Sequence, residues 1–388
     1  MAEMRFEFAT ANRIVFGPGV AADLPQITAS LGDRPFVLTG GTPEHYEQIV
    51  KLLTETNLEP TTFGIRGEPT TETVSAAAAA ARQARADVVV GIGGGSAIDA
   101  GKAVAAMLTN EGNIEDYLEV VGLGKPLKNR SAPYIAVPTT AGTGAEVTRN
   151  AVLLVREHRV KVSMRSPFLL PEVALVDPLL THSMAPDVTA ATGLDALTQL
   201  IEAFVTKKAN PLTDGICREG LRCAARSLRR AFEDGDDATA RQDMALAALF
   251  SGLALANAGL GAVHGFAGPL GGMIGAPHGV VCGRLLPHVM AANVKALQAR
   301  VPDSPALARF DEIAWIVTGD DSARASDGVA WVDDLCHVLT LPGLRRHGLT
   351  EADFPDAVAQ AKKASSMKGN PIELHDDELT AILAVAMD

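Results

Sequence analysis

The segment VVVGIGGGSAIDAGKA, which begins at residue 88, constrains the fold of this chain more than any other. In it an apolar run leads directly into a helical pattern through glycines at positions 91, 93, 94 and 95. Glycine costs conformational entropy on folding, so this concentration indicates a backbone that a ligand approaches closely. The free N–H groups and the dipole at a helix start favour an anion, and Ser96 adds a hydroxyl donor. We therefore predict a buried strand, a tight turn and a helix that bind the phosphates of a dinucleotide.

This turn matches neither of two widespread phosphate-binding motifs. Ser96 stands where the G-x-G-x-x-G fingerprint has its last glycine, and the Gly-Lys-Ser/Thr of a P-loop does not follow. The predicted strand ends near residues 39–42 and 139–148 carry further glycines and threonines. Ligands of open α/β sheets bind at such strand ends. Because the loop at 39–42 lacks an acidic residue to hold a ribose 2′-hydroxyl, either NAD or NADP is expected to fit.

The order of elements predicts two domains, as a length of 388 residues also suggests. Strand-like and helical runs alternate up to about residue 180, which predicts an α/β domain over residues 1–183, with a parallel sheet covered by helices on both faces. The remainder, residues 184–388, shows only helical patterns and is expected to be all-helical. The strands are expected at 13–17, 35–40, 86–95, 134–140 and 173–178. The helices are expected at 43–56, 71–85, 97–110, 188–206, 211–233, 239–259, 280–299, 305–318, 324–338, 350–364 and 376–387.

The composition narrows the class of protein. A formal net charge of −12 argues against a nucleic-acid-binding surface. No stretch reaches the ~18 consecutive apolar residues of a membrane helix, and we find no signal peptide near the amino terminus, so we expect a cytoplasmic protein without a membrane partner. The four cysteines form no CxxC pair and are expected to be reduced, mostly buried thiols.

A second constellation lies in the predicted helical domain. Asp195 and Gln199 are four residues apart and share a helix face, and His264 and His278 flank a glycine-rich turn. One carboxylate and two imidazoles suit a divalent ion such as iron or zinc. Such an ion would act as a Lewis acid on an alcohol or carbonyl oxygen. The competing interpretation of each histidine is an ordinary structural residue.

With these motifs in hand, the chain resembles the iron-containing (type III) alcohol dehydrogenase family of the dehydroquinate-synthase-like superfamily. The resemblance covers nearly the whole length. It rests on GGGSAIDAGK, VPTTAGTGAEVT, the KVS…P…A…DP stretch, TGLDALTQLIEAF, VHGFAGPLGGMIGAPHG and NPIELHDDELTAIL. It implies a dinucleotide-binding domain, a helical domain, and hydride transfer in the cleft between them.

The resemblance also implies roles for individual residues. By resemblance, the expected cofactor-binding residues are Gly94, Gly95, Ser96, Asp99, Thr139, Thr140, Thr143 and Lys161; the loop after the second strand adds Gly40, Gly41 and Thr42 to this expectation. By resemblance, Asp195, His264 and His278 are expected to be metal ligands and to lie at the catalytic centre, and Gln199, at the position of a fourth ligand, can offer an amide oxygen.

Two positions depart from the family pattern. The family usually has histidines where this chain has Gln199 and Gly268. An amide oxygen is a weaker and harder ligand than imidazole, so lower metal affinity or a shift away from iron is expected, and Gly268 removes a proton relay.

The sequence thus predicts an NAD(P)-dependent oxidoreductase acting on CH–OH groups: an alcohol dehydrogenase or aldehyde–ketone reductase with a small-molecule alcohol, aldehyde or oxo-acid substrate, forming a homodimer or larger homo-oligomer. Three alternatives remain open. One is a metal-independent reductase of an activated oxo acid, as in maleylacetate reductase; the others are a non-redox, NAD-using cyclase or lyase and a non-catalytic dinucleotide-binding protein.

Overall fold

The computed structural model of the chain describes residues 5–41, 46–56, 58–158 and 160–388. The chain forms two compact units. One holds residues 10–140 and 144–182, and is called the sheet unit. The other, the helical unit, holds residues 183–388 together with 5–9 and 141–143. The boundary predicted between residues 183 and 184 stays a prediction.

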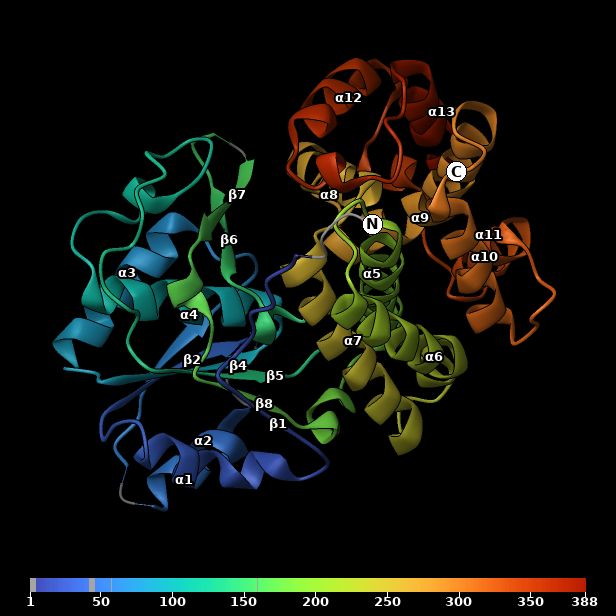
Figure 1. The fold of residues 1–388 in the computed structure, drawn as a ribbon. Coiled ribbons are helices and arrows are strands. Elements are labelled where there is room, and N and C mark those ends of the chain that lie inside the picture. Colours follow the sequence, from blue (N-terminus) through green and yellow to red (C-terminus); the bar gives the residue numbers. More distant parts are fainter. Residues whose placement is uncertain (1–4, 42–45, 57, 159) are drawn as a thin grey trace. The chain divides into compact units, whose positions relative to one another are not determined.

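The sheet unit is built on six parallel strands in the order β1-β8-β5-β4-β2-β3 (Figure 1). Their bounds are β1 Arg13–Phe16, β2 Pro35–Gly40, β3 Thr61–Ile65, β4 Val88–Gly93, β5 Tyr134–Pro138 and β8 Val173–Val176. The predicted parallel sheet is confirmed. Only β3 was not predicted, because it lies at the sheet edge and its exposed residues give it no apolar run.

Helices cover both faces of this sheet, as predicted. Alternate residues of a strand point to opposite faces. Thus Val37 packs in one core cluster with α1 (Leu24–Ala29) and α2 (Glu47–Thr54), whereas its neighbours Phe36 and Leu38 pack in another with α3 (Thr71–Gln83) and α4 (Gly95–Thr109). Figure 1 shows α1 and α2 on one side of the strands and α3 and α4 on the other. The part of the predicted helix at 43–45 lies outside the described residues.

Two further strands, β6 (Asn150–Val155) and β7 (Val160–Arg165), form an antiparallel pair that was not predicted. In β6 every second residue is buried, so the pair lies with one face on the core. Its inner residues Ala151, Leu153 and Val162 join the cluster beside α3 and α4.

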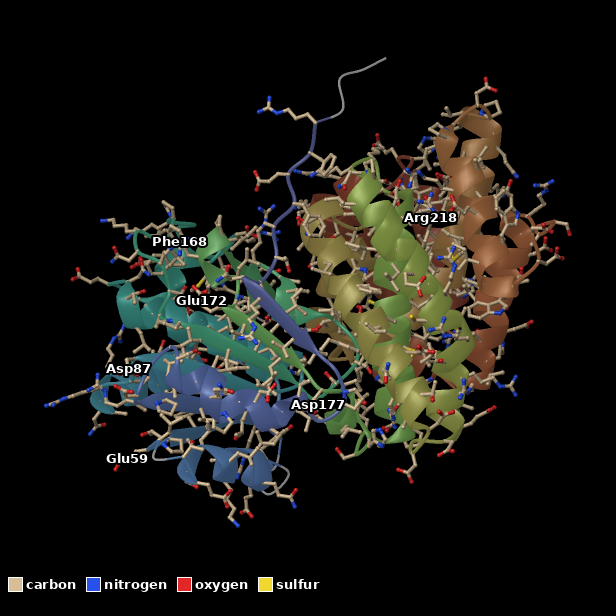
Figure 2. The ribbon with its side chains drawn as sticks, turned by 60° about the horizontal axis from the view of Figure 1, so that its bottom comes forward. Glu59, Asp87, Phe168, Glu172, Asp177 and Arg218 are labelled. Carbon is tan, nitrogen blue, oxygen red and sulfur yellow. The ribbon has the colours of Figure 1, made fainter. Side chains whose placement is uncertain are left out.

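Asp177 lies directly after β8 and is the aspartate of the KVS…P…A…DP stretch (Figure 2). Its contacts are structural. Its Oδ1 accepts hydrogen bonds from the backbone N–H groups of Gly19 (3.0 Å) and Leu179 (3.0 Å), and its Oδ2 accepts one from Ala21 (3.1 Å). The carboxylate therefore fastens the turn after β1 to the segment that ends β8.

The helical unit contains helices and no strand among its described residues, so the all-helical prediction is confirmed. They are α5 Pro186–Val205, α6 Pro211–Glu233, α7 Ala238–Ala258, α8 Ala262–Ile274, α9 His278–Arg300, α10 Pro305–Thr318, α11 Ala325–Val338, α12 Phe354–Lys363 and α13 Asp376–Ala386. Helix α8 was not predicted, because its glycines and Pro269 are unfavourable for a helix. One of them is closely packed: a Cβ at Gly265 would lie 2.8 Å from Cε and 3.3 Å from Cβ of Met367, whose side chain would have to shift.

Short segments outside the main helical sequence complete this unit. The backbone of Ala9 exchanges two hydrogen bonds with the side chain of Asn257, at 2.7 and 2.9 Å. The carbonyl oxygen of Gly142 accepts a hydrogen bond from Oγ of Ser251 (3.1 Å). Helix α5 belongs to the core of the helical unit, because its residues are buried from Gly193 onward.

Among the described residues, no single helix is both long and apolar enough to cross a membrane; α7 and α8 meet both conditions only when they are taken together, and they are bent by 102° at the break between them.

Candidate active site

The carboxyl ends of β2, β4 and β5 lie side by side in the sheet and bring three glycine- or threonine-containing loops together. Gly93, the last residue of β4, has a φ of 151°. A Cβ there would lie 2.8 Å from Cβ of Ala97 and 3.0 Å from the backbone nitrogen of Gly40. The carbonyl of Gly93 also accepts a hydrogen bond from the N–H of Thr139 (2.9 Å). A glycine is therefore required for β4 to turn into α4 at this point.

Helix α4 begins immediately after this turn. Gly94 is the N-cap and Gly95 the first helical residue, and both remain partly exposed, as does Ser96, while the residues around them are buried. A Cβ on Gly94 would lie 3.3 Å from Cγ2 of Thr140, so the two loops touch. The first N–H groups of a helix have no partner within it, and with the helix dipole they form a site for an anion. The structure thus brings Gly94, Gly95, Ser96 and Thr140 together at the start of α4, and their role in binding a cofactor stays a prediction.

The neighbouring loop adds a residue that the sequence did not reveal. The hydroxyl of Tyr46 lies 3.3 Å from Oγ1 of Thr139. Gly41, also predicted here, is exposed and has a φ of 64°, whereas Thr42 lies outside the described residues. Tyr46 belongs to no motif, so only the fold shows that it reaches the end of β5.

Asp99, predicted to line the cofactor, has structural partners for both of its oxygens. Oδ1 accepts from Nζ of Lys102 (3.2 Å), and Oδ2 accepts from the N–H of Val152 (3.0 Å). Lys102 is buried and also donates to Oγ1 of Thr148 (2.8 Å) and to the carbonyl of Asn150 (2.7 Å). Burial raises the pKa of Asp99 and lowers that of Lys102, although each partner favours the charged form of the other. A cofactor role for Asp99 stays a prediction.

Two other predicted cofactor residues lie elsewhere. Lys161 is on β7, where its Nζ pairs with Oε1 of Glu68 at 2.7 Å. Thr143 belongs to the helical unit and lines the cavity described below.

In the helical unit, three of the four predicted metal ligands converge with one residue that was not predicted. Asp195 comes from the middle of α5, His264 from α8, His278 from the first position of α9, and Cys282 from the next turn of α9. Their ligand atoms all lie within 4.8 Å of one another. Oδ1 of Asp195 is 3.2 Å from Nε2 of His264 and 3.7 Å from Nε2 of His278.

Glu202 orients one of these ligands. It is buried one helix turn beyond Gln199 on α5, and its Oε2 accepts a hydrogen bond from Nδ1 of His264 at 2.7 Å. Its Oε1 accepts the backbone N–H of Val263 at 2.7 Å. Because Glu202 holds Nδ1 of His264, Nε2 is the nitrogen that faces Asp195. Metal-binding histidines are commonly held in this way by a carboxylate.

In this cluster the charges and hydrogen bonds of neighbouring groups together affect the pKa values more than burial does. Burial opposes ionisation of each group most strongly, yet the neighbouring groups lower the pKa of Asp195, raise the pKa of His278, and hold the pKa of His264 well above its ordinary value. The cluster therefore favours positive charge beside Asp195, and a metal ion would bind these ligands in their deprotonated forms.

Gln199 is buried, and its Oε1 has no hydrogen-bond partner among the described residues. An unpaired buried amide oxygen costs free energy unless something else satisfies it. At Gly268 a Cβ would meet no atom within 4 Å, so the space for the side chain missing there is open.

A cavity of about 760 Å³ adjoins this cluster within the helical unit. Asp195 and His278 are among its lining residues, and apolar side chains such as Val188, Phe232 and Leu341 form much of its wall. It therefore offers a mainly apolar space beside the polar cluster.

Comparison with known proteins assigns the chain. Residues 11–178 match the family described as iron-containing alcohol dehydrogenase, and residues 189–387 match the C-terminal part of the same family. The chain belongs to the iron-containing alcohol dehydrogenase family. It is 35% identical over 394 residues to 1,3-propanediol dehydrogenase of Klebsiella pneumoniae, with 100% of both chains covered.

Solved structures agree. The chain is similar to the crystal structure of a 1,3-propanediol oxidoreductase, with a TM-score of 0.90, 34% identity, and 99% of this chain and 100% of that chain covered. It is also similar to sulfoacetaldehyde reductase from Bifidobacterium kashiwanohense in complex with NAD⁺, with a TM-score of 0.87, 29% identity and 99% of both chains covered.

As a member of the iron-containing alcohol dehydrogenase family, the chain is an NAD(P)-dependent oxidoreductase that acts on CH–OH groups of small molecules. The predicted family and function are thereby confirmed, and the alternatives that lack alcohol dehydrogenase activity are not favoured.

Proposed function

We propose that this alcohol dehydrogenase holds the substrate oxygen at Asp195, His264 and His278. The observation that carries the proposal is the convergence of these side chains from α5, α8 and α9 into one cluster that adjoins a mainly apolar cavity. The arrangement supplies charge and position next to a space for a small molecule, and the hydride chemistry belongs to the nicotinamide.

The cofactor is NAD or NADP, bound with its phosphates at the start of α4. The free N–H groups there and the close approach of the loops after β2, β4 and β5 support this assignment. The proposed contacts are Gly40, Gly41, Thr42, Gly94, Gly95, Ser96, Asp99, Thr139, Thr140, Thr143 and Lys161. β2 ends in Thr39 and Gly40, with no carboxylate in these positions to repel a 2′-phosphate. Comparison of kcat/KM with each cofactor distinguishes the two.

A divalent ion, iron or zinc, fits the cluster. The donor set is one carboxylate, two imidazoles and one thiol, and the buried Oε1 of Gln199 lacks a partner among the described residues. Asp195, His264, His278 and Gln199 would hold the ion, which when bound supplies a Lewis acid that polarises the alcohol or carbonyl oxygen. Glu202 keeps His264 in the tautomer whose Nε2 is available.

The cavity indicates the class of substrate. Its apolar wall favours an alcohol with an apolar body over a polyol, whose hydroxyl groups would lose their hydrogen bonds with water. We expect kcat/KM to rise with the length of a series of primary alcohols before it reaches a plateau.

The decisive experiment measures oxidation of NADH and NADPH against a panel of aldehydes and oxo acids, and the reverse reaction with the matching alcohols. We expect turnover that falls at least ~100-fold in Asp195→Ala, the typical cost of losing a group that stabilises developing charge. Elemental analysis and activity before and after chelation test the ion. Turnover that Asp195→Ala leaves unchanged, in a folded variant, would refute the proposed site.

The protein is further proposed to act in the cytoplasm as a homodimer or larger homo-oligomer. Four free, buried cysteines suit a reducing compartment, and β1 is an edge strand whose outer side pairs with no other described strand. Light scattering of the purified protein gives the mass of the assembly.

A further inference from the structure

Cys282 is the one member of the cluster to which the proposed function assigns no bond to the ion. It lies on α9, one helix turn after His278, and its side chain is fully buried. Its Sγ is 3.7 Å from Nε2 of His264 and 3.6 Å from Nε2 of His278. A thiol that merely filled the core would not need two imidazole nitrogens and a carboxylate as neighbours.

The distances match those between ligands of one tetrahedral ion. Bonds of about 2.0–2.1 Å to nitrogen and oxygen and about 2.3 Å to sulfur place neighbouring ligand atoms ~3.3–3.6 Å apart. The separations that join Asp195 or Cys282 to His264 or His278 run from 3.2 to 3.7 Å, and all four ligand atoms lie within 4.8 Å of one another. The side chains therefore already stand at positions that a single small ion between them would impose.

We propose that Cys282 is a direct ligand of the metal ion at this site, and that its thiolate makes the site selective for zinc over iron. This inference rests on the metal-binding part of the proposed function. The thiol gives up its proton to solvent when the ion binds, since the thiolate is the form that coordinates. Thiolate is a soft ligand that suits zinc, and the intrinsic order of affinities also places zinc above iron(II).

The other cysteines provide a matched control. Cys217 on α6 is as fully buried as Cys282, but it is not a member of the cluster. Cys217→Ala therefore removes a buried thiol of the same size without removing a proposed ligand.

The first experiment replaces the bound ion of the whole protein with cobalt(II), whose bond to a thiolate gives an intense charge-transfer absorption in the near ultraviolet. We expect this band in the wild-type protein and in Cys217→Ala, and its loss in Cys282→Ala. Zinc affinity of Cys282→Ala should fall by more than the ~10–100-fold that the loss of an outer partner costs. A band that persists in folded Cys282→Ala would overturn the proposal.

The second experiment needs no variant, so it decides the matter even if Cys282→Ala fails to fold. X-ray absorption of the zinc-loaded wild-type protein should show sulfur in the first coordination shell, and zinc should displace iron(II) when equal amounts compete for the metal-free protein. A shell of nitrogen and oxygen alone, or retention of iron, contradicts the inference. Both readouts are independent of turnover, so failure of the proposed catalytic site would be recognised separately.

Discussion

Oε2 of Glu202 lies 2.7 Å from Nδ1 of His264, so a carboxylate accepts the hydrogen bond of this imidazole on the side away from Asp195. In Glu202→Gln the amide can still accept the N–H of Val263, but the charge that favours the Nδ1–H tautomer is lost. We expect metal affinity and kcat/KM each to fall by about 10–100-fold. Calorimetric titration with zinc and steady-state kinetics measure the two effects.

The control for this change is Glu219→Gln, which removes a charge from an exposed pair with Arg222. Such surface pairs contribute little, so both quantities should stay at the wild-type level. If metal affinity and kcat/KM were the same in the two variants, Glu202 would have no role in positioning His264.

Gln199→His tests the departure from the family pattern. The buried amide oxygen of Gln199 has no partner among the described residues, and imidazole is a better ligand for a divalent ion than an amide. We expect iron(II) to bind about tenfold or more tightly. If iron affinity is unchanged or lower, position 199 does not face the ion. Elemental analysis after dialysis against a fixed concentration of chelator gives the comparison.

Gly93→Ala should damage the start of α4. The added Cβ would lie within 3.0 Å of Ala97 and of the Gly40 backbone, at a φ of 151° that alanine rarely adopts. We expect a loss of ~1–3 kcal/mol in unfolding free energy and weaker binding of NADH. Gly64→Ala, in β3, is the matched control, because its Cβ would meet nothing within 4 Å. Urea unfolding and fluorescence titration with NADH supply the values; a variant as stable as Gly64→Ala would show that the turn tolerates a side chain.

Stability should depend on pH through Glu146. Burial raises the pKa of this carboxyl from 4.5 to about 7, against the opposing charge of Lys102. Between these two values the native state holds a proton that the unfolded state has lost, so stability falls as the pH rises through this window. Glu146→Gln cannot ionise and should lose less stability over the same range, by up to ~3 kcal/mol at pH 8 relative to pH 4.

Thermal unfolding of wild type and Glu146→Gln at a series of pH values measures the effect. Parallel curves from pH 4 to pH 8 would mean that Glu146 ionises normally in the native protein.

The sheet and most helices could be predicted because the pattern of apolar residues in their sequences indicates which residues are buried. The core strands β2 and β4 are buried throughout, and such runs between turn residues are readable from sequence alone. Strands β3 and β7 could not be found in the same way, since polar residues interrupt their apolar pattern. Helix α8 was hidden by glycines whose role is close packing, as at Gly265 against Met367.

Some residues of the candidate site could likewise be predicted from the sequence, and others could not. Asp195, His264 and His278 were found because their residue types suggest metal chemistry and their motifs mark the family. Cys282 was interpreted only as a buried thiol, and it is buried. Its spacing of four residues from His278 was a usable signal, because both lie on α9 and residues four apart share a helix face. Tyr46 gave no such signal, since only the fold brings it to Thr139.

The bonds of Lys102 have a consequence for how the sheet unit opens. Its ammonium group has three donors, and they go to Asp99 on α4, to Thr148, and to the carbonyl of Asn150 at the start of β6. Asp99 in turn accepts the amide of Val152. Helix α4 and the β6–β7 pair cannot separate without leaving a buried charge unpaired, so their amides should exchange with deuterium as one cooperative unit. Bound dinucleotide would then slow exchange as far away as Val152, through a lysine that it never touches.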